Sequence, residues 1–181
     1  MKINALRLQQ HFEAMSLIGK IGETGTCRPA HTELEKQGFK IAASWMQEAG
    51  MKTRIDNFGN LIGRLEGKNP NLPCLMMGSH LDSQPYGGRF DGVAGVLCAI
   101  EVVTTLTENG IQPERPIEVI SFADEEGWRF NKGLFGSRGI LGKLEEGELQ
   151  RADKDGITRE QALKDFGCDV TEFKASEYKE G

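Results

Sequence analysis

The sequence lacks the features of several large classes of protein. Among its 181 residues there is no apolar stretch long enough to span a membrane, and the opening MKINALRLQQHFEAM is amphipathic, without the apolar centre of a signal peptide. The net charge is −5 and no cluster of Lys and Arg is present, which argues against a nucleic-acid partner. We therefore predict a cytoplasmic protein that binds neither membranes nor nucleic acid.

Cysteine is scarce and is not arranged for metal or disulfide chemistry. No C-x-x-C pair occurs, and two of the cysteines fall in apolar segments, so we expect reduced, buried thiols. The four cysteines are Cys27, Cys74, Cys98 and Cys168.

Internal repeats and low-complexity linkers are also absent, so the length predicts about one domain. Beyond Gly133 the chain grows polar, although Thr158 and Gln161 could cap a short helix that ends at Gly167. The final residues, EFKASEYKEG, offer almost nothing to bury.

Helical periodicity predicts two helices in the N-terminal part of the chain. Residues 4–19 place apolar side chains at helical spacing, with Asn4 as the N-cap. A second helix begins at Thr32, which forms a capping box with Glu35, and it ends at Gly50. Its predicted buried stripe consists of Leu34, Ile41, Trp45 and Ala49.

Strand patterns follow these helices. MKTRIDNFGNLIGRLEG predicts two short strands joined by a turn at 57–60. LPCLMMGS shows no alternation, so we predict a strand that is buried on both faces. An apolar helix face from Gly92 to Leu106 separates it from the β-rich RPIEVISFADEEG. Strand, helix and strand at this spacing predict a right-handed βαβ unit with parallel strands.

The βαβ unit brings polar side chains to one edge of the predicted sheet. His80 follows the first strand, and Asp91 begins the helix. Asp124, Glu125 and Glu126 end the second strand. Because ligands of open α/β sheets gather beyond the carboxyl ends of the strands, we expect an imidazole and several carboxylates to meet in one crevice.

Each of these residues also has a structural interpretation. Asp91 could cap the helix, DEEG could be a solvated acidic turn, and a lone histidine is more often structural than a ligand. Together, however, close carboxylates repel one another unless a cation relieves them. Mixed His and carboxylate donors suit Zn²⁺, and Mn²⁺, Co²⁺ or Ni²⁺ could use the same donors. The remaining histidines, His11 and His31, lie outside this pattern and are interpreted as structural.

A division of labour among the carboxylates follows from their spacing. Asp82 could accept the second N–H of the His80 imidazole and fix its tautomer, while the glycines let the loop close beneath the metal. Glu125 and Glu126 would point to opposite faces of a straight strand, so both reach one site only if the backbone turns, as Gly127 permits. One glutamate could then bind metal while the other acts as a general base, and the pattern leaves open which does which.

Two long segments in this order, GSHLDSQPYGGRFDGVAGVL and PIEVISFADEEGWRF, resemble the zinc-dependent amidase or carbamoylase family. The flanking GNLIGRLEG and LFGSRGILGKL are similar too. That family includes N-carbamoyl-L-amino-acid hydrolases, β-ureidopropionases and allantoate amidohydrolases, and it is related to the aminoacylases and dinuclear-zinc exopeptidases. The resemblance implies a three-layer α/β domain with a mostly parallel central sheet.

The resemblance also implies roles for the matching residues. His80 would bind one of two divalent metal ions, Glu126 the other, and Asp91 would bridge them. Glu125 would be the general base and Asp82 the partner of His80. The implied reaction is hydrolysis of a linear amide C–N bond, converting an N-carbamoyl-L-amino acid to the amino acid, CO₂ and ammonia. An aminoacylase, a peptidase or an allantoate amidohydrolase is the alternative.

Family members are much longer than this sequence. They carry a further histidine ligand downstream, a lid or dimerisation domain, and a last histidine ligand near the C-terminus. We therefore expect residues 1–181 to be the N-terminal, truncated part of the catalytic metal-binding domain, inactive alone, with a homodimeric full-length form. A non-catalytic remnant that binds metal weakly or only associates with a partner is the alternative.

Overall fold

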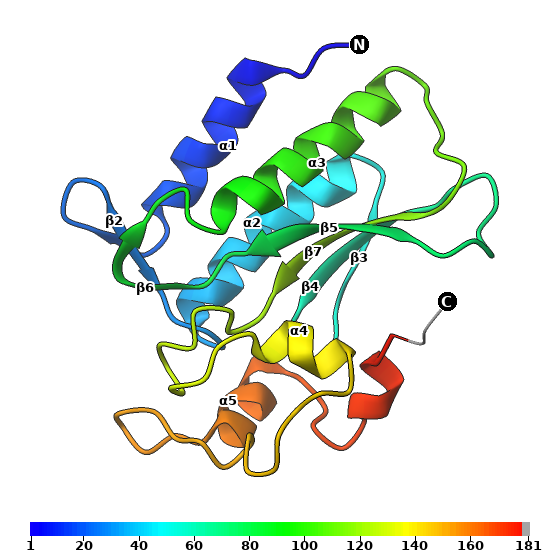
Figure 1. The fold of residues 1–181 in the computed structure, drawn as a ribbon. Helices are drawn as coiled ribbons and strands as arrows, with labels where there is room; N and C mark the ends of the chain where they lie inside the picture. Colours follow the sequence, from blue (N-terminus) through cyan, green and yellow to red (C-terminus); the bar gives the residue numbers. More distant parts are fainter. Residues whose placement is uncertain (179–181) are drawn as a thin grey trace.

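The predicted βαβ unit lies at the centre of the computed structural model, which describes residues 1–178. It consists of β5 (Leu75–His80), α3 (Val93–Glu108) and β7 (Ile117–Phe122). β5 and β7 pair in parallel, with Leu75 opposite Ile117 and His80 opposite Phe122, and α3 packs on both strands (Figure 1). The predicted parallel unit is confirmed, and the chain after each strand leaves the sheet at the same edge.

The sheet around this unit is mixed, so the prediction of a mostly parallel central sheet is wrong. Its strand order is β3-β4-β7-β5, where β3 spans Lys52–Ile55 and β4 spans Leu61–Leu65. β3 pairs with β4, and β4 with β7, in antiparallel fashion. The short turn at 57–60 explains the first of these pairings, because strands joined by a few residues can pair only antiparallel.

A second, three-stranded sheet is entirely antiparallel, in the order β1 (Lys20–Ile21), β2 (Gly25–Arg28), β6 (Ser83–Gly88). β6 is the SQPYGG segment, which the sequence predicted to be a glycine-rich loop. Proline and glycine are poor strand formers, but pairing with β2 overrides that local preference.

Helices α1 (Ala5–Leu17) and α2 (Glu33–Glu48) lie beside α3, and α2 covers β3 and β4 (Figure 1). The predicted N-caps are confirmed: the Asn4 side chain accepts the N–H of Arg7, and the Thr32 side chain accepts that of Glu35. The capping box is only half formed, because the Glu35 carboxylate accepts the N–H of His31 at 2.6 Å. None of the helices within residues 1–178 is long and apolar enough to cross a membrane.

The buried stripe of α2 differs from the predicted one. Leu34 is exposed, and Trp45 is only half-buried, with its indole stacked on the His11 ring at a centroid distance of 3.9 Å. The helix is turned so that the adjacent row faces the sheet. The buried apolar residues on this side are Phe39, Ala42, Met46 and the predicted Ala49.

The C-terminal third contributes more to the core than its polarity predicted. It forms α4 (Phe135–Ile140), α5 (Arg159–Phe166) and the 3₁₀ helix η1 (Phe173–Ser176). α5 has the predicted caps, Thr158 at its start and Gly167 at its end. Within EFKASEYKEG the Phe173 ring stacks on Phe58 at 4.6 Å, and residues 179–181 lie outside the described part.

Two burial predictions are wrong. β5 is the edge strand of its sheet in the described part of the chain, and Leu75 is exposed there, not buried on both faces. Cys98 lies on the outer side of α3 and is exposed. All four cysteines are free as predicted, but only Cys168 is fully buried.

Gly78 lies where β5 and β7 approach too closely for a side chain, because a Cβ there would overlap the carbonyl oxygen of Ile120. We expect Gly78→Ala to lower the free energy of unfolding by about 2 kcal/mol, measured by denaturant titration. Gly38→Ala in α2 is the control, since its Cβ would make ordinary contacts at 3.6 Å and alanine favours a helix. Parental stability in Gly78→Ala would contradict the close approach.

Candidate active site

Three predicted site residues meet beyond the carboxyl ends of β5 and β7. His80 is the last residue of β5, Asp91 precedes α3, and Glu125 follows β7. The Nε2 atom of His80 lies 3.4 Å from a carboxylate oxygen of Glu125 and 3.9 Å from one of Asp91. The parallel pairing of β5 with β7 therefore brings these three side chains together at one edge of the sheet.

The orientation of the His80 ring is fixed by its other nitrogen. Nδ1 lies 3.0 Å from the backbone carbonyl oxygen of Asp82 and 3.6 Å from its carboxylate. A proton on Nδ1 satisfies this carbonyl and leaves the lone pair on Nε2, which faces Glu125 and Asp91. The sequence assigned this contact to the Asp82 carboxylate, whereas the backbone oxygen is nearer.

The Asp82 carboxylate instead holds the two glutamates. Its oxygens accept the backbone N–H groups of Glu125 at 3.3 Å and Glu126 at 3.2 Å. Burial raises the pKa of Asp82 to about 7, the nearby Asp124 carboxylate adds to this, and His80 together with the two N–H groups opposes it. Asp82 therefore links the β5 edge to the turn that carries both glutamates.

That turn lets adjacent glutamates serve one site. Its backbone is left-handed at Gly127, with φ of +64°, and also at Asp124, with φ of +49°. The sequence predicted the turn from Gly127 alone, although Asp is among the residues that adopt this conformation most readily. The carbonyl of Glu125 accepts the N–H of Leu134 at 3.0 Å, which closes the loop.

Structural interpretations of the acidic residues are wrong at two positions. Gly92 is the N-cap residue of α3 and no side chain caps this helix, so Asp91 is not a cap. Asp124 is buried, so DEEG is not simply a solvated turn. The side chains of Asp91 and Glu125 are 62% and 34% exposed, so solvent reaches both carboxylates.

The imidazole and carboxylate groups at this edge of the sheet are of the types that bind divalent cations. Burial raises the pKa of Glu126, the carboxylates of Asp91 and Glu125 raise it further, and His80 lowers it. Oε1 of Glu126 is buried without a hydrogen-bond partner. Unpaired oxygens among like charges are stabilised by a cation. Within residues 1–178, however, no three His, Cys, Asp or Glu side chains form a ready-made metal site.

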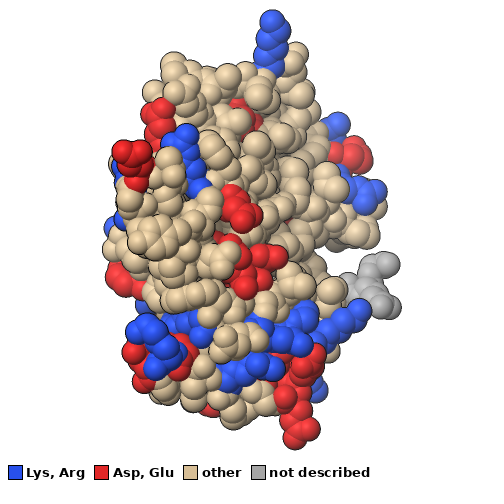
Figure 2. Space-filling view, turned by 60° about the vertical axis from the view of Figure 1, so that its left-hand side comes forward, with Lys and Arg blue, Asp and Glu red and all other residues tan. Residues whose placement is uncertain are grey.

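Charge is unevenly distributed around the molecule. On the face drawn in Figure 2, acidic side chains gather near the middle and Lys and Arg side chains form a band below them. The formal net charge of −5 thus hides separate acidic and basic regions.

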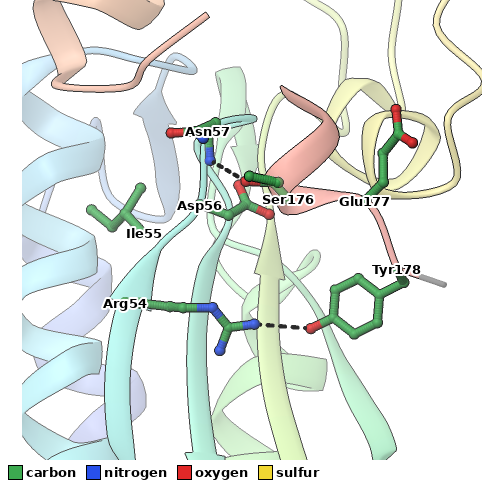
Figure 3. A pocket seen from close by; sticks show the side chains of 8 residues that line it. Arg54, Ile55, Asp56, Asn57, Ser176, Glu177 and Tyr178 are labelled. Atoms are coloured by element: carbon green, nitrogen blue, oxygen red, sulfur yellow. Dashed lines mark hydrogen bonds between the residues drawn. The ribbon is translucent and has the colours of Figure 1, made fainter. Parts of the chain in front are cut away.

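A pocket of about 440 Å³ lies away from these residues and is lined by β3, the following turn and residues 175–178 (Figure 3). The N–H of Asn57 donates to Ser176 Oγ at 3.0 Å, and Arg54 Nη2 donates to the Tyr178 hydroxyl at 3.2 Å. These contacts attach the C-terminal segment to the sheet, and none of the predicted site residues lines the pocket.

Sequence reasoning missed three residues that hold the site. Arg28 is fully buried, and its Nε donates to the carbonyl of Leu81 at 2.9 Å. Asn60 Oδ1 accepts the N–H of Ala123 at 2.8 Å. Arg159 contacts Asp124, 35 positions away. Only Asn60, in the predicted turn, carries a local signal; the other two depend on long-range contacts.

Comparison with known proteins gives consistent matches. A family model described as Peptidase family M28 matches residues 60–157. An N-carbamoyl-L-amino-acid amidohydrolase from Pseudomonas sp. (strain NS671) is 47% identical over 93% of this chain and 41% of its own length. An N-carbamoyl-L-amino acid amidohydrolase from Geobacillus stearothermophilus is 41% identical over 99% of this chain and 44% of its own length.

Solved structures show the same relationship. A hydantoinase/carbamoylase family amidase from Burkholderia ambifaria superposes with a TM-score of 0.88 at 40% identity, covering 92% of this chain and 41% of that one. The chain therefore shares the α/β fold of these amidases over part of their catalytic domain, and it spans about two fifths of the length of the relatives it matches.

Proposed function

The chain belongs to peptidase family M28 and to the M28-like hydantoinase/carbamoylase amidases. We therefore propose that it is part of a metal-dependent hydrolase that cleaves a linear amide C–N bond. The proposed substrate class is the N-carbamoyl-L-amino acids, after the names of its relatives. The observation that supports this most directly is the approach of Glu125 and Asp91 to His80 Nε2, at 3.4 and 3.9 Å.

We infer that His80, Asp91 and Glu126 would hold two divalent ions, Zn²⁺ foremost. His80 offers Nε2, whose lone pair is available when Nδ1 carries the proton, and Glu126 offers a buried oxygen without a hydrogen-bond partner within residues 1–178. A divalent cation at these donors supplies Lewis-acid chemistry, which acidifies water and polarises a carbonyl group.

Glu125 is the proposed general base. Its carboxylate is partly exposed and lies beside His80, so it can reach a water molecule in the crevice. It would accept the proton of the water that attacks the carbonyl carbon and deliver it to the leaving nitrogen as the C–N bond breaks. From an N-carbamoyl amino acid the products are the amino acid and carbamic acid, which decomposes to CO₂ and ammonia.

Three donors are few for two metal ions, since a catalytic zinc ion takes about three protein ligands. We therefore propose that residues 1–181 supply one part of the catalytic domain and that further ligands come from another part of the complete protein.

A substrate panel tests the function. The complete protein is assayed with allantoate and with three derivatives of the same amino acid: the N-carbamoyl compound, the N-acetyl compound and a dipeptide. We expect kcat/KM for the carbamoyl compounds to exceed that for the acyl compounds and dipeptides by roughly 100-fold, because a site that pairs with the terminal amide rejects substrates that lack it. A preference for dipeptides would favour the peptidase alternative.

A further inference from the structure

Arg159 is buried against the turn that carries Glu125 and Glu126, although it is the first residue of α5, which comes much later in the sequence. Its Nη2 donates to Asp124 Oδ2 at 2.7 Å and to the carbonyl of Lys132 at 2.9 Å. Both acceptors belong to the segment that forms the loop after β7. One guanidinium therefore ties the start of this loop to its end.

The guanidinium is held by further contacts. Its Nη1 donates to the Glu148 carboxylate, which also pairs with Arg138. The Cζ atom of Arg159 lies 4.4 Å from the ring centroid of Phe135 and 4.9 Å from that of Phe130. The positive charges of Arg159 and Arg138 thus balance the negative charges of Asp124 and Glu148, as a buried ionic cluster requires. The planar fork of arginine suits these simultaneous contacts better than the single ammonium of lysine.

Asp124 transmits this restraint to the site. Its backbone is left-handed, with φ of +49°. Its carbonyl accepts the N–H of Phe135 at 3.2 Å. Without the bond from Arg159 the buried carboxylate would lack its charged partner, and the turn would lose one of its restraints.

The two glutamates follow Asp124 directly. The Asp82 carboxylate accepts both of their N–H groups, and Arg159 holds the side chain of Asp124. The backbone bonds of the loop, such as Leu134 N–H to Glu125 and Phe135 N–H to Asp124, do not fix where the two carboxylates point. Loss of the Asp82 or the Arg159 contact would let these carboxylates turn away from His80.

We propose that Arg159 is a positioning residue that acts through Asp124 to aim Glu125 and Glu126 at His80. The inference rests on the proposed function, because only that function gives Glu125 and Glu126 their catalytic and metal-binding roles. The restraint that Arg159 places on the turn can be measured independently of it.

The test compares Arg159→Lys and Arg159→Met with the parent in the complete protein. Arg151→Met is the matched control, because Arg151 lies 3.9 Å from the same Glu148 carboxylate, is 38% exposed, and has no bond to Asp124. Three quantities are measured: amide hydrogen exchange at 123–127 and in α3, the affinity of the metal-free protein for Zn²⁺ by calorimetry, and kcat and KM separately.

Loss of the restraint predicts faster exchange at 123–127 with unchanged exchange in α3. Zn²⁺ affinity should fall by roughly 10–100-fold, as for other groups that orient metal ligands, and kcat should fall with little change in KM. Arg159→Lys should show a smaller effect than Arg159→Met, and Arg151→Met none.

If Arg159→Met fails to fold, Arg159→Lys and Asp124→Asn carry the test, since asparagine tolerates a left-handed backbone. A folded Arg159→Lys or Asp124→Asn protein with parental exchange at 123–127 would overturn the inference, as would equal loss of protection in α3. Failure of the parent to bind Zn²⁺ or to hydrolyse any amide would refute the proposed function instead, and the exchange data would still decide the role of Arg159.

Discussion

Replacing Glu125 by glutamine in the complete protein should lower kcat for an N-carbamoyl-L-amino acid by roughly 10²–10⁴-fold, the usual contribution of a general base. Glutamine keeps the size of the side chain and leaves the backbone N–H to Asp82 unchanged. It cannot accept a proton from water. The measurement is steady-state kinetics with the parent and variant at equal Zn²⁺ loading, verified by metal analysis.

Glu126→Gln distinguishes the two glutamates. Glu126 has a buried oxygen without a partner among the described residues, so its replacement should weaken Zn²⁺ binding more than it slows the proton transfer. Excess Zn²⁺ should therefore restore part of the activity. Glu172→Gln, at an exposed position in the C-terminal segment, is the control and should behave as the parent. Turnover of Glu125→Gln within a few-fold of the parent would show that another group accepts the proton.

The position of these glutamates could be predicted because the information is local. The apolar runs of β5, α3 and β7 and the residues directly after them define a parallel unit, and its geometry forces His80 and Glu125 to one edge. The rest of the sheet could not be read in this way. β4 lies between β3 and β7, so the sheet is mixed, and nothing in the pattern of LIGRL identifies both of its neighbours.

Restraints across long sequence separations were invisible for a related reason. Arg28 and Arg159 are fully buried cations whose partners lie 53 and 35 positions away. In sequence they stand in polar surroundings where arginine is usually solvated. β6 was missed because a Pro- and Gly-containing segment becomes a strand only when β2 is present to pair with it.

His31 should make the protein sensitive to acid. The imidazole is buried beside Phe135 and Phe166, and within residues 1–178 neither ring nitrogen makes a hydrogen bond of good geometry, although the backbone of Phe58 lies near enough to favour the charged ring. Burial, followed by the positive charges of Arg159 and Arg129, lowers the pKa of His31 to about 3. The folded protein therefore keeps this histidine neutral down to about pH 3.

The sign of the effect follows from the pKa difference. In the unfolded chain histidine has a pKa of about 6.5, so between pH 6.5 and about 3 the unfolded state binds more protons than the folded state. Stability from His31 is complete above pH 6.5 and is lost as the pH falls. At about 1.4 kcal/mol per pH unit, the loss between pH 6.5 and pH 4 is roughly 3 kcal/mol.

The comparison of parent and His31→Asn isolates this contribution. Asparagine tolerates the φ of +54° at this position and keeps the backbone N–H that donates to Glu35 at 2.6 Å. Free energies of unfolding are measured by denaturant titration at pH 7 and pH 4. The parent should lose roughly 3 kcal/mol more than the variant over this range, while the titration of carboxyl groups common to both proteins cancels in the difference.

His11→Asn provides the control for a generic histidine effect. His11 is half-buried against Trp45, and burial lowers its pKa in the same direction. Because this ring is only partly shielded from water, its removal should change the acid sensitivity much less than His31→Asn does. Equal losses of stability in the parent and in His31→Asn would mean that the buried ring takes up a proton in the folded state despite burial and the positive charges of Arg159 and Arg129.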